Sequence, residues 1–408
     1  DNFGSPLGKG WTHNWNIFLF SNPSSASGGS TSSIGLKRGD GRIVYFRLSN
    51  GIYYPDPQSG ETSSISFTNG AYILTEKSGT TYNFNASTGK ITSSRDRNGN
   101  TTTLSYSGDN LVSITDPSGR VIYLAYDSEK RISTITDLNG NTYSFSYAND
   151  ALSGIEQSAI SYQQSAWKYT YDASGQMLTK TDPSGYTTTY NYDSEGKVIS
   201  SQDPEGKIKA ISYQPSANTV TVTEKDGGVW TYKYDPLLNV TTQKTDPQGN
   251  VTTSQYDSYK DLISKTEPDG GITSYTYDEY GNMKSVQDAS GSITSYTYNA
   301  FGEVTSVTDS EGNTTGYTYD TNGNLLSTTD PAGATTQYQY DTKGNITVLT
   351  NPNGQTTTFA YDQFNNMISV TDPSGATTRF TFDNAGNMLA QMDSAGNTTE
   401  YAYDSLNR

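Results

Sequence analysis

The sequence predicts an all-β protein built from a long array of β-hairpins, and three observations support this fold class. From residue 256 onward the pair Tyr-Asp, or a close variant, returns every 21 residues. Each copy contains two turn sequences in which Asp and Gly keep a fixed spacing. Between the turns, apolar and polar side chains alternate. A fixed period of this size is typical of repeat proteins, in which each unit buries its apolar face against its neighbours.

The turns can be read from one unit, which runs from Asp372 to Gln391. Its first turn has the sequence Asp-Pro-Ser-Gly and ends at Gly375, and its second has the sequence Asp-Asn-Ala-Gly and begins at Asp383. Asp at the first position and Gly at the fourth, with Pro second, suit a type I turn followed by a left-handed glycine. Two turns in 21 residues leave two short strands, so each unit is predicted to be a hairpin.

The strands are indicated by alternation, which places Thr378, Phe380 and Phe382 on one face. Stacked units then align equivalent side chains. The first aromatic ladder consists of Tyr275, Tyr296, Tyr317, Tyr338, Phe359, Phe380 and Tyr401. The returning strands supply Leu262, Met283, Val304, Leu325, Ile346, Met367 and Met388. Because these positions share one face, we expect the ladders to form the core.

The Tyr-Asp pairs form the second ladder and are the candidate structural residues of the repeat. They are Tyr256, Asp257, Tyr277, Asp278, Tyr298 (followed by Asn299), Tyr319, Asp320, Tyr340, Asp341, Tyr361, Asp362, Phe382, Asp383, Tyr403 and Asp404. Cross-strand pairs of this kind contribute roughly 0.2–1 kcal/mol each. We therefore expect stability to be shared among many neighbouring units.

The chain is predicted to have two parts. Residues 1–94 do not follow the repeat and are expected to form an all-β capping module, with strands near 17–20, 41–47, 52–54, 64–67, 72–76 and 80–84 and a Ser/Gly loop at 24–33. Residues 95–408 contain the repeats, irregular over 95–255 and regular over 256–408, and residues 149–168 are predicted to loop out. Because the last unit is incomplete, we expect the chain to be part of a longer protein.

Composition excludes several classes of function. The net charge of −16 and the pI of about 4.4 disfavour binding to nucleic acid or to anionic membranes. The chain has no cysteine, which excludes disulfides, thiolate metal sites and cysteine nucleophiles. No apolar run is long enough to cross a bilayer. We therefore predict a protein with no nucleic-acid partner and no membrane insertion.

Residues with catalytic or metal-binding chemistry are few, and we predict neither an enzyme nor a cofactor. His13 is the only histidine, and we interpret it as a packing or turn residue rather than part of a triad or a zinc site. Sequences such as Asp-Thr-Asn-Gly-Asn at Asp320 are similar to calcium loops but lack the closing Glu, so turn chemistry explains them. The scattered carboxylates are interpreted as solvated edge charges rather than a glycosidase pair: Glu195, Glu205, Glu224, Glu267 and Glu303.

The motif Tyr-Asp-x-x-Gly-Asn, with Asp-Pro-x-Gly-x-Thr-Thr between copies, resembles the YD repeats of the Rhs family over about residues 95–408. That family includes bacterial Rhs and wall-associated polymorphic toxins, the B and C components of insecticidal toxin complexes, and teneurins. The segment from Pro6 to Asn16 is similar to the opening of Rhs-type proteins. The resemblance implies a long sheet that spirals into a hollow shell around a C-terminal toxic domain, with the self-cleavage motif expected after Arg408.

These observations predict a non-catalytic structural region of a secreted or cell-surface bacterial protein, whose β-shell encloses a toxin or other cargo domain of the parent chain. The alternative is an extended adhesive or filamentous module that binds glycans or neighbouring cells through surface tyrosines. An open final sheet edge would also permit self-association. The first interpretation predicts a curved hollow particle, and the second predicts a rod.

Overall fold

The computed structural model describes residues 6–7, 13–21, 33–56, 59, 61–157 and 165–403. In these residues it has one antiparallel sheet of 37 strands. Each strand pairs with the strands before and after it in the chain, as β23 with β24 and β24 with β25, so the sheet is one continuous meander. The fold is therefore all-β, as the repeat pattern predicts, and the sheet does not close on itself.

The strands of the first part are β1 Phe18–Ser21, β2 Ser33–Lys37, β3 Ile43–Ser49, β4 Ile52–Pro55, β5 Ser64–Thr68, β6 Ala71–Thr75, β7 Thr81–Asn85 and β8 Ile91–Arg95. The irregular units contribute β9 Thr101–Ser107, β10 Asn110–Thr115, β11 Val121–Tyr126, β12 Ile132–Thr136, β13 Thr142–Ala148, β14 Ala151–Gln157, β15 Ser165–Tyr171, β16 Met177–Thr181, β17 Thr187–Tyr192, β18 Val198–Gln202, β19 Ile208–Gln214, β20 Thr219–Thr223, β21 Val229–Asp235, β22 Val240–Thr245 and β23 Val251–Tyr256. The 3-10 turn η3 Pro215–Ala217 joins β19 to β20.

The regular units contribute β24 Leu262–Thr266, β25 Ile272–Tyr277, β26 Met283–Gln287, β27 Ile293–Tyr298, β28 Val304–Thr308, β29 Thr314–Tyr319, β30 Leu325–Thr329, β31 Thr335–Tyr340, β32 Ile346–Thr350, β33 Thr356–Tyr361, β34 Met367–Thr371, β35 Thr377–Phe382, β36 Met388–Met392 and β37 Thr398–Glu400. Each unit from Tyr256 onward supplies two strands of five or six residues, except the last.

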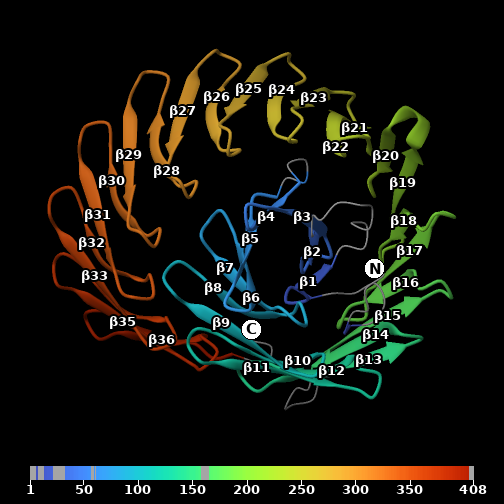
Figure 1. The fold of residues 1–408 in the computed structure, drawn as a ribbon, viewed down its shortest axis with the longest axis horizontal. Helices are drawn as coiled ribbons and strands as arrows, with labels where there is room; N and C mark the ends of the chain where they lie inside the picture. The colour runs from blue at the N-terminus through green and yellow to red at the C-terminus, as the bar shows by residue number, and fades with distance from the viewer. Residues whose placement is uncertain are drawn as a thin grey trace.

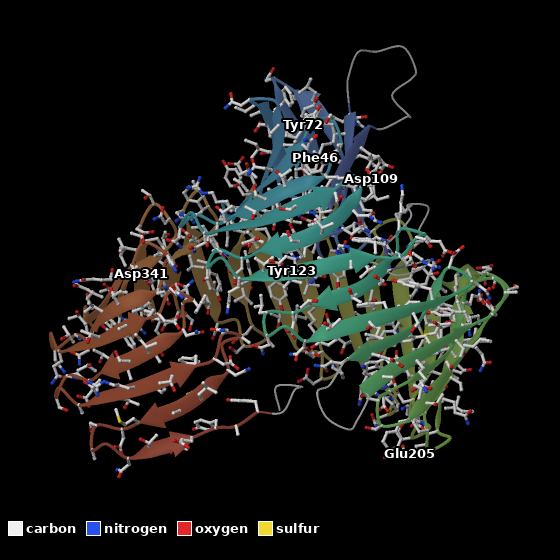
Figure 2. All side chains as sticks on the ribbon, turned by 90° about the horizontal axis from the view of Figure 1, so that it is seen from below. Phe46, Tyr72, Asp109, Tyr123, Glu205 and Asp341 are labelled. Carbon is white, nitrogen blue, oxygen red and sulfur yellow. The ribbon has the colours of Figure 1, made fainter. Side chains whose placement is uncertain are left out.

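The sheet curls into a spiral rather than extending as a flat ribbon. In Figure 1 the strands from β9 to β36 follow one another around a ring, while β1 to β8 lie at its centre. The perpendicular view in Figure 2 places those first strands at one end of the ring, above the rest of the wall. The N-terminal strands therefore cover one end of a curved, single-layered wall.

The main hydrophobic cluster of the described residues lies at this covered end, and further buried hydrophobic side chains lie on β14 and β15: Ala151, Leu152 and Tyr169. A cluster of buried side chains includes Phe46, Ile65 and Phe84 from the N-terminal strands, all fully buried. It continues into the first repeats through Leu124 and Ile132. The proposed division at residue 94 thus separates two sequence patterns, whereas the packed core extends across it.

Two details differ from the sequence predictions. Residues 149–168 do not all loop out: β14 and β15 are regular strands, and only residues 158–164 lie outside the described part. Asn149 and Asp150 have φ of 49° and 62°, so they form a tight hairpin turn without the Asp-Pro-x-Gly signature. The predicted Ser/Gly loop at 24–33 falls mostly outside the described residues, but its last residue, Ser33, begins strand β2.

Candidate functional site

Each Tyr-Asp turn is closed by its own aspartate. Asp278 Oδ1 accepts hydrogen bonds from the backbone N–H of Tyr280 at 2.9 Å and of Asn282 at 2.8 Å, while Asn282 Nδ2 donates to Asp278 Oδ2 at 2.7 Å. The Gly281 N–H donates to the carbonyl of Asp278 at 3.1 Å, and Gly281 has a φ of 74°. This is the predicted type I turn followed by a left-handed glycine, and the positive φ explains why glycine is favoured there.

The same closure recurs at Asp320, Asp341, Asp362 and Asp383. Burial alone raises the pKa of these carboxyl groups, but the hydrogen bonds from the following Asn and the backbone amides outweigh it and hold each pKa below its ordinary value. Both carboxylate oxygens are therefore used within the turn, which favours the turn interpretation over a calcium loop. No three His, Cys, Asp or Glu side chains of the described residues are grouped so as to hold a metal ion.

In many units the repeat tyrosine forms a hydrogen bond to the preceding unit. Tyr340 Oη donates a hydrogen bond to the carbonyl of Leu325 at 2.8 Å, fifteen residues earlier. The same bond joins Tyr277 to Leu262, Tyr298 to Met283 and Tyr319 to Val304, and in the irregular units Tyr126 to Leu111, Tyr147 to Ile132, Tyr192 to Met177 and Tyr213 to Val198. Tyrosine therefore supplies both an aromatic face and a repeated hydrogen bond.

A β-bulge explains why that carbonyl needs a partner. Within the hairpin of β29 and β30, Thr318 pairs with Ser327 but Tyr319 pairs with Leu325, so Leu326 is the extra residue of the bulge. On its other side, β30 pairs with β31 only from Ser327 onward. A bulge leaves backbone groups outside the ladder, and the tyrosine hydroxyl of the next unit occupies that position wherever the bond is found.

The remaining predicted residues follow the same register. Tyr256 lies opposite Leu262, Tyr361 opposite Met367 and Phe382 opposite Met388. Phe382 has no hydroxyl and supplies only the apolar contact. Tyr403 is exposed at the end of the array, and Asp404 lies outside the described residues.

The ladders share one face, as predicted, but they do not form a buried core. Between residues 170 and 403 no residue is buried. The tyrosines of the Tyr-Asp ladder are half-buried up to Tyr361, including Tyr340. The prediction of a core was wrong in this respect, because a single layer has no second layer to cover it. Burial nevertheless raises the pKa of Tyr277, Tyr319 and Tyr340, so their hydroxyl groups remain hydrogen-bond donors at neutral pH.

The face that carries these ladders is the inner face of the ring. In the first units the equivalent positions hold Leu111 and Ile132, which are buried in the core formed with the N-terminal strands, and Tyr106 and Tyr126 pack against that core. Those strands lie at the centre of the ring (Figure 1). Because the sheet is continuous, the tyrosine and aliphatic ladders of later units face the same interior.

A seam of polar contacts joins the N-terminal turns to the Tyr-Asp turns of the regular units. We define it by Lys77, Arg97, Asn98 and Asn100 on one side. Lys77 Nζ donates to the carbonyl of Tyr280 at 2.7 Å, and Asn98 and Asn324 exchange two side-chain hydrogen bonds of 3.1 and 2.8 Å. Asn100 Nδ2 donates to the carbonyl of Lys343 at 2.8 Å. These contacts span more than 200 residues of sequence and connect the N-terminal part of the sheet to the regular units.

Arg97 makes the strongest set of contacts in the seam. Its guanidinium forms an ion pair with Glu303, donates to the carbonyl of Thr321 at 3.2 Å, and lies 4.0 Å from the centre of the Phe301 ring. The Arg97 side chain is only 12% exposed. Arg120 lies 5.7 Å from the Phe364 ring and forms an ion pair with Asp116 at 2.6 Å. Sequence reasoning missed the seam, since nothing in the repeat marks residues that meet across a turn of the spiral.

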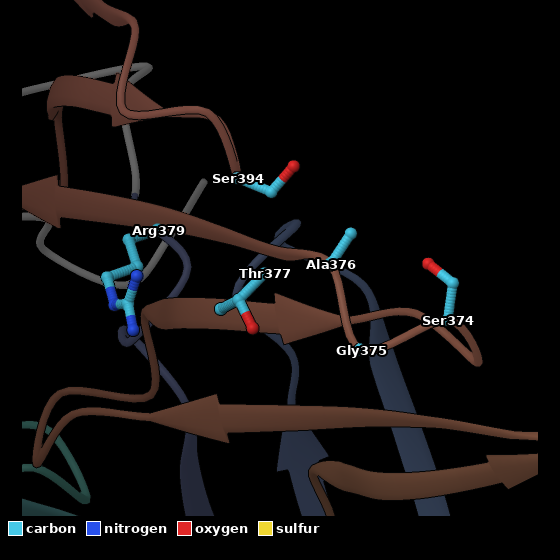
Figure 3. Close-up of a pocket in the computed structure, with 6 residues that line it drawn as sticks. All are labelled: Ser374, Gly375, Ala376, Thr377, Arg379 and Ser394. Atoms are coloured by element: carbon cyan, nitrogen blue, oxygen red, sulfur yellow. The ribbon is translucent and has the colours of Figure 1, made fainter.

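Two hollows lie on the surface of the described residues, and neither has catalytic chemistry. The first, of about 490 Å³, is an open depression beside β35 and β36; Figure 3 shows Ser374, Ala376 and Ser394 around it and Arg379 set apart from them. The second, of about 1440 Å³, lies between the N-terminal strands and the turns of β23 to β28. Neither brings together a nucleophile, a base and an orienting group.

The other candidate residues have structural surroundings. Burial lowers the pKa of His13 to about 4, with the positive charge of Lys37 acting in the same direction, so the imidazole is neutral at pH 7. Glu195 pairs with Lys197, Glu224 with Lys209 and Glu267 with Lys265. Glu205 donates a backbone N–H to Asp203 Oδ1 at 3.1 Å. Glu195, Glu224 and Glu267 are thus paired locally along the sheet. The interpretation of Glu303 as a solvated edge charge was wrong, because its side chain is only 20% exposed and pairs with the distant Arg97.

The geometry defines a class of protein: a spiral, single-layered β-wall built from tyrosine-linked hairpins. Residues 67–185 and 288–408 match the family described as Teneurin YD-shell, and residues 165–208, 234–272 and 256–293 match the RHS Repeat. Since the first match spans more than half of the chain, the protein belongs to the teneurin YD-shell family. A search of curated proteins finds no match.

The chain is also similar to solved structures of Tc toxin components. The crystal structure of TcdB2-TccC3 without the hypervariable C-terminal region is 14% identical, with a TM-score of 0.51 over 96% of this chain and 27% of that chain. TcdB2-TccC3-TEV is 14% identical, with a TM-score of 0.46 over 93% of this chain and 21% of that chain. The first likeness supports the fold, and this chain spans about a quarter of those longer chains. Among the described residues, no helix is long and apolar enough to cross a membrane.

Proposed function

We propose that this chain is a non-catalytic wall segment of a secreted or cell-surface protein, whose spiral sheet encloses a toxin or other cargo domain of the same parent chain. Membership of a structural shell family supports the proposal, as does the Tc toxin fold that the chain shares. The observation that carries it is the inner face: the ladders point into the ring, and the N-terminal strands already occupy its centre at one end.

Containment follows from many weak contacts rather than from a reaction. Each hairpin is fixed by its turn aspartate and most are tied to their neighbours by a tyrosine hydroxyl, so the wall resists opening at any one unit. The half-buried tyrosines present aromatic surface with the hydroxyl groups already bonded, which suits apolar contact with enclosed polypeptide. We propose the division into residues 1–94 as the covering module and 95–408 as the wall.

The experiment is a protease-protection assay on the longer parent chain that contains this segment. The region beyond this segment should survive a protease dose that degrades the same region expressed alone, and it should become sensitive at the denaturant concentration that unfolds the wall. Equal sensitivity of the enclosed and the isolated region would contradict containment. Rods without internal volume in electron micrographs would favour the adhesive alternative, for which the comparisons offer no support.

A further inference from the structure

At two Tyr-Asp turns an aromatic ring of the turn contacts an arginine side chain from the first repeats of the chain. Phe301 and Phe364 both lie three residues after the tyrosine of their pair, and each faces a guanidinium, that of Arg97 at 4.0 Å and that of Arg120 at 5.7 Å. In the first case a carboxylate of the same turn, Glu303, completes the site with an ion pair. A ring face together with a carboxylate is a favourable site for arginine.

In the two units before Phe301, the equivalent aromatic residue has no cation over its ring among the described residues. Tyr259 and Tyr280 also lie three residues after the tyrosine of their pairs, and they are 58% and 66% exposed. Of the cation–ring contacts found among the described residues, none involves either ring. Both tyrosines border the hollow of about 1440 Å³, which is large enough for several residues of a peptide.

The charges around this hollow favour a positive ligand. Asp257, Asp261 and Glu279 line it beside the two tyrosines. Asp261 takes the place of the asparagine that closes most of the regular turns, so its carboxylate lies beside that of Asp257. Burial and then this neighbouring charge raise the pKa of Asp261. Glu61 and Glu76, on the opposite side, are already paired with Arg38 at 2.9 and 2.6 Å.

The one lysine of the lining is held at the edge. Lys77 Nζ donates to the carbonyl of Tyr280 at 2.7 Å and to Asn282 Oδ1 at 2.6 Å. It therefore fixes the backbone of the Tyr280 turn, and this turn is positioned by the seam in the same way as the turn that holds Arg97.

We infer that this hollow binds an arginine-bearing segment of another polypeptide, with a guanidinium over Tyr259 or Tyr280 and its charge against Asp261 and Glu279. The inference extends the occupied Arg97 site to two neighbouring units and does not depend on containment. It assigns a docking role to the end of the wall covered by the N-terminal strands. The size of the hollow favours a peptide segment over a small guanidinium compound.

The test is calorimetric titration of this chain with a short peptide that has two arginines separated by one glycine. The control peptide carries citrulline, which keeps the shape of arginine without its charge. We expect the arginine peptide to bind at 150 mM salt, and the citrulline peptide to bind at least tenfold more weakly. Absence of binding by the arginine peptide, equal binding of the two peptides, or equal binding of methylguanidinium would overturn the inference.

Variants separate the site from the general negative charge of the protein. Asp261→Asn and the double variant Tyr259→Leu/Tyr280→Leu should each weaken binding at least fivefold. The matched controls are Asp309→Asn, in an exposed turn of another unit, and Tyr123→Leu, an exposed tyrosine on β11; these should bind as the parent chain does. Circular dichroism and thermal melting establish that each variant is folded. An equal loss in Asp261→Asn and Asp309→Asn would overturn the inference in favour of non-specific attraction.

Discussion

The N-terminal part of this chain and the later repeats stabilise the same sheet by different contacts. The N-terminal strands and the first repeats pack two faces together and bury side chains such as Phe46, Leu74 and Phe84 completely. From residue 170 to residue 403 the same kind of hairpin continues, yet no residue is buried. The comparison shows that hairpins of this type need no packed core once turn aspartates, tyrosine hydroxyls and neighbouring units hold each strand.

The contrast predicts that replacing a phenylalanine by alanine lowers the free energy of unfolding far more in the N-terminal core than in the wall. Phe46→Ala should lower the free energy of unfolding by about 3–5 kcal/mol, because it leaves a cavity in a closed core. Phe380→Ala, in the half-buried ladder, should cost about 1–2 kcal/mol, since solvent fills the vacated space. Denaturant unfolding followed by tyrosine and tryptophan fluorescence measures both. Equal losses of unfolding free energy in the two variants would mean that the ladder of the wall is as well covered as the N-terminal core.

The seam between the two regions can be broken separately. Arg97→Leu removes the ion pair with Glu303 and the contact with Phe301, and we expect a loss of about 2 kcal/mol. Small-angle scattering should also show an increased radius of gyration, because the spiral is released at one point. Arg379→Leu, an exposed arginine of the wall, is the control and should change stability by less than about 0.5 kcal/mol. An unchanged radius in the Arg97 variant would show that the curvature is set within the hairpins alone.

The N-terminal end should carry a pH dependence between about pH 6.5 and 5, above the range in which the wall loses the stability contributed by its turn aspartates, whose pKa values are lowered. His13 has a folded pKa of about 4, below its unfolded value, so the unfolded chain binds the proton more tightly. The stability contributed by neutral His13 is complete above about pH 6.5 and falls as the pH is lowered, by about 2 kcal/mol at pH 5. Thermal melting across this range checks the slope. His13→Gln should remove it, and a slope that persists in this variant would assign it to carboxyl groups instead.

The tyrosine hydrogen bond can be tested by a reciprocal exchange within the wall. Tyr340→Phe deletes the bond to the Leu325 carbonyl and should cost about 1 kcal/mol. Phe382→Tyr adds a hydroxyl at the equivalent position of a unit that lacks one, next to the Met367 carbonyl, and should stabilise the protein by a smaller amount. Urea unfolding midpoints compare the two. If both exchanges were neutral, the hydroxyl groups would serve solubility rather than attachment between units.

The smallest effect concerns the turns themselves. Lys260 has a φ of 71° at the position where most units have glycine, a conformation that costs a non-glycine residue free energy. Lys260→Gly should therefore stabilise the protein by about 0.5–1 kcal/mol. The opposite change, Gly281→Ala at a φ of 74°, should destabilise by a similar amount. Thermal shifts of the two variants in the same direction would contradict the turn geometry.

The hairpin array was predictable because its signals are local. Asp372 to Gly375 specify a turn by residue type alone, and the alternation up to Phe382 assigns the ladder to one face. Contacts between distant units were not predictable in this way. The pairing of Arg97 with Glu303 depends on the curvature of some twenty intervening strands, which no single repeat encodes.

Burial was the other feature that local sequence did not reveal. The face of Tyr340 and that of Tyr126 follow the same pattern, yet only Tyr126 packs against the buried core. The difference arises from the N-terminal strands, which cover the first repeats and not the later ones. Likewise, the strand from Ala151 to Gln157 was missed because its turn uses Asn149 and Asp150 instead of the repeat signature.

The central claim is that the repeats form one curved wall around an interior, and single-particle electron microscopy of this chain tests it most directly. An uncurved sheet of 37 strands spaced about 4.8 Å apart would be roughly 180 Å long. We predict an open ring about half that length or less across, with the N-terminal strands covering one end. Straight particles approaching the full length, with no central hollow, would contradict the account.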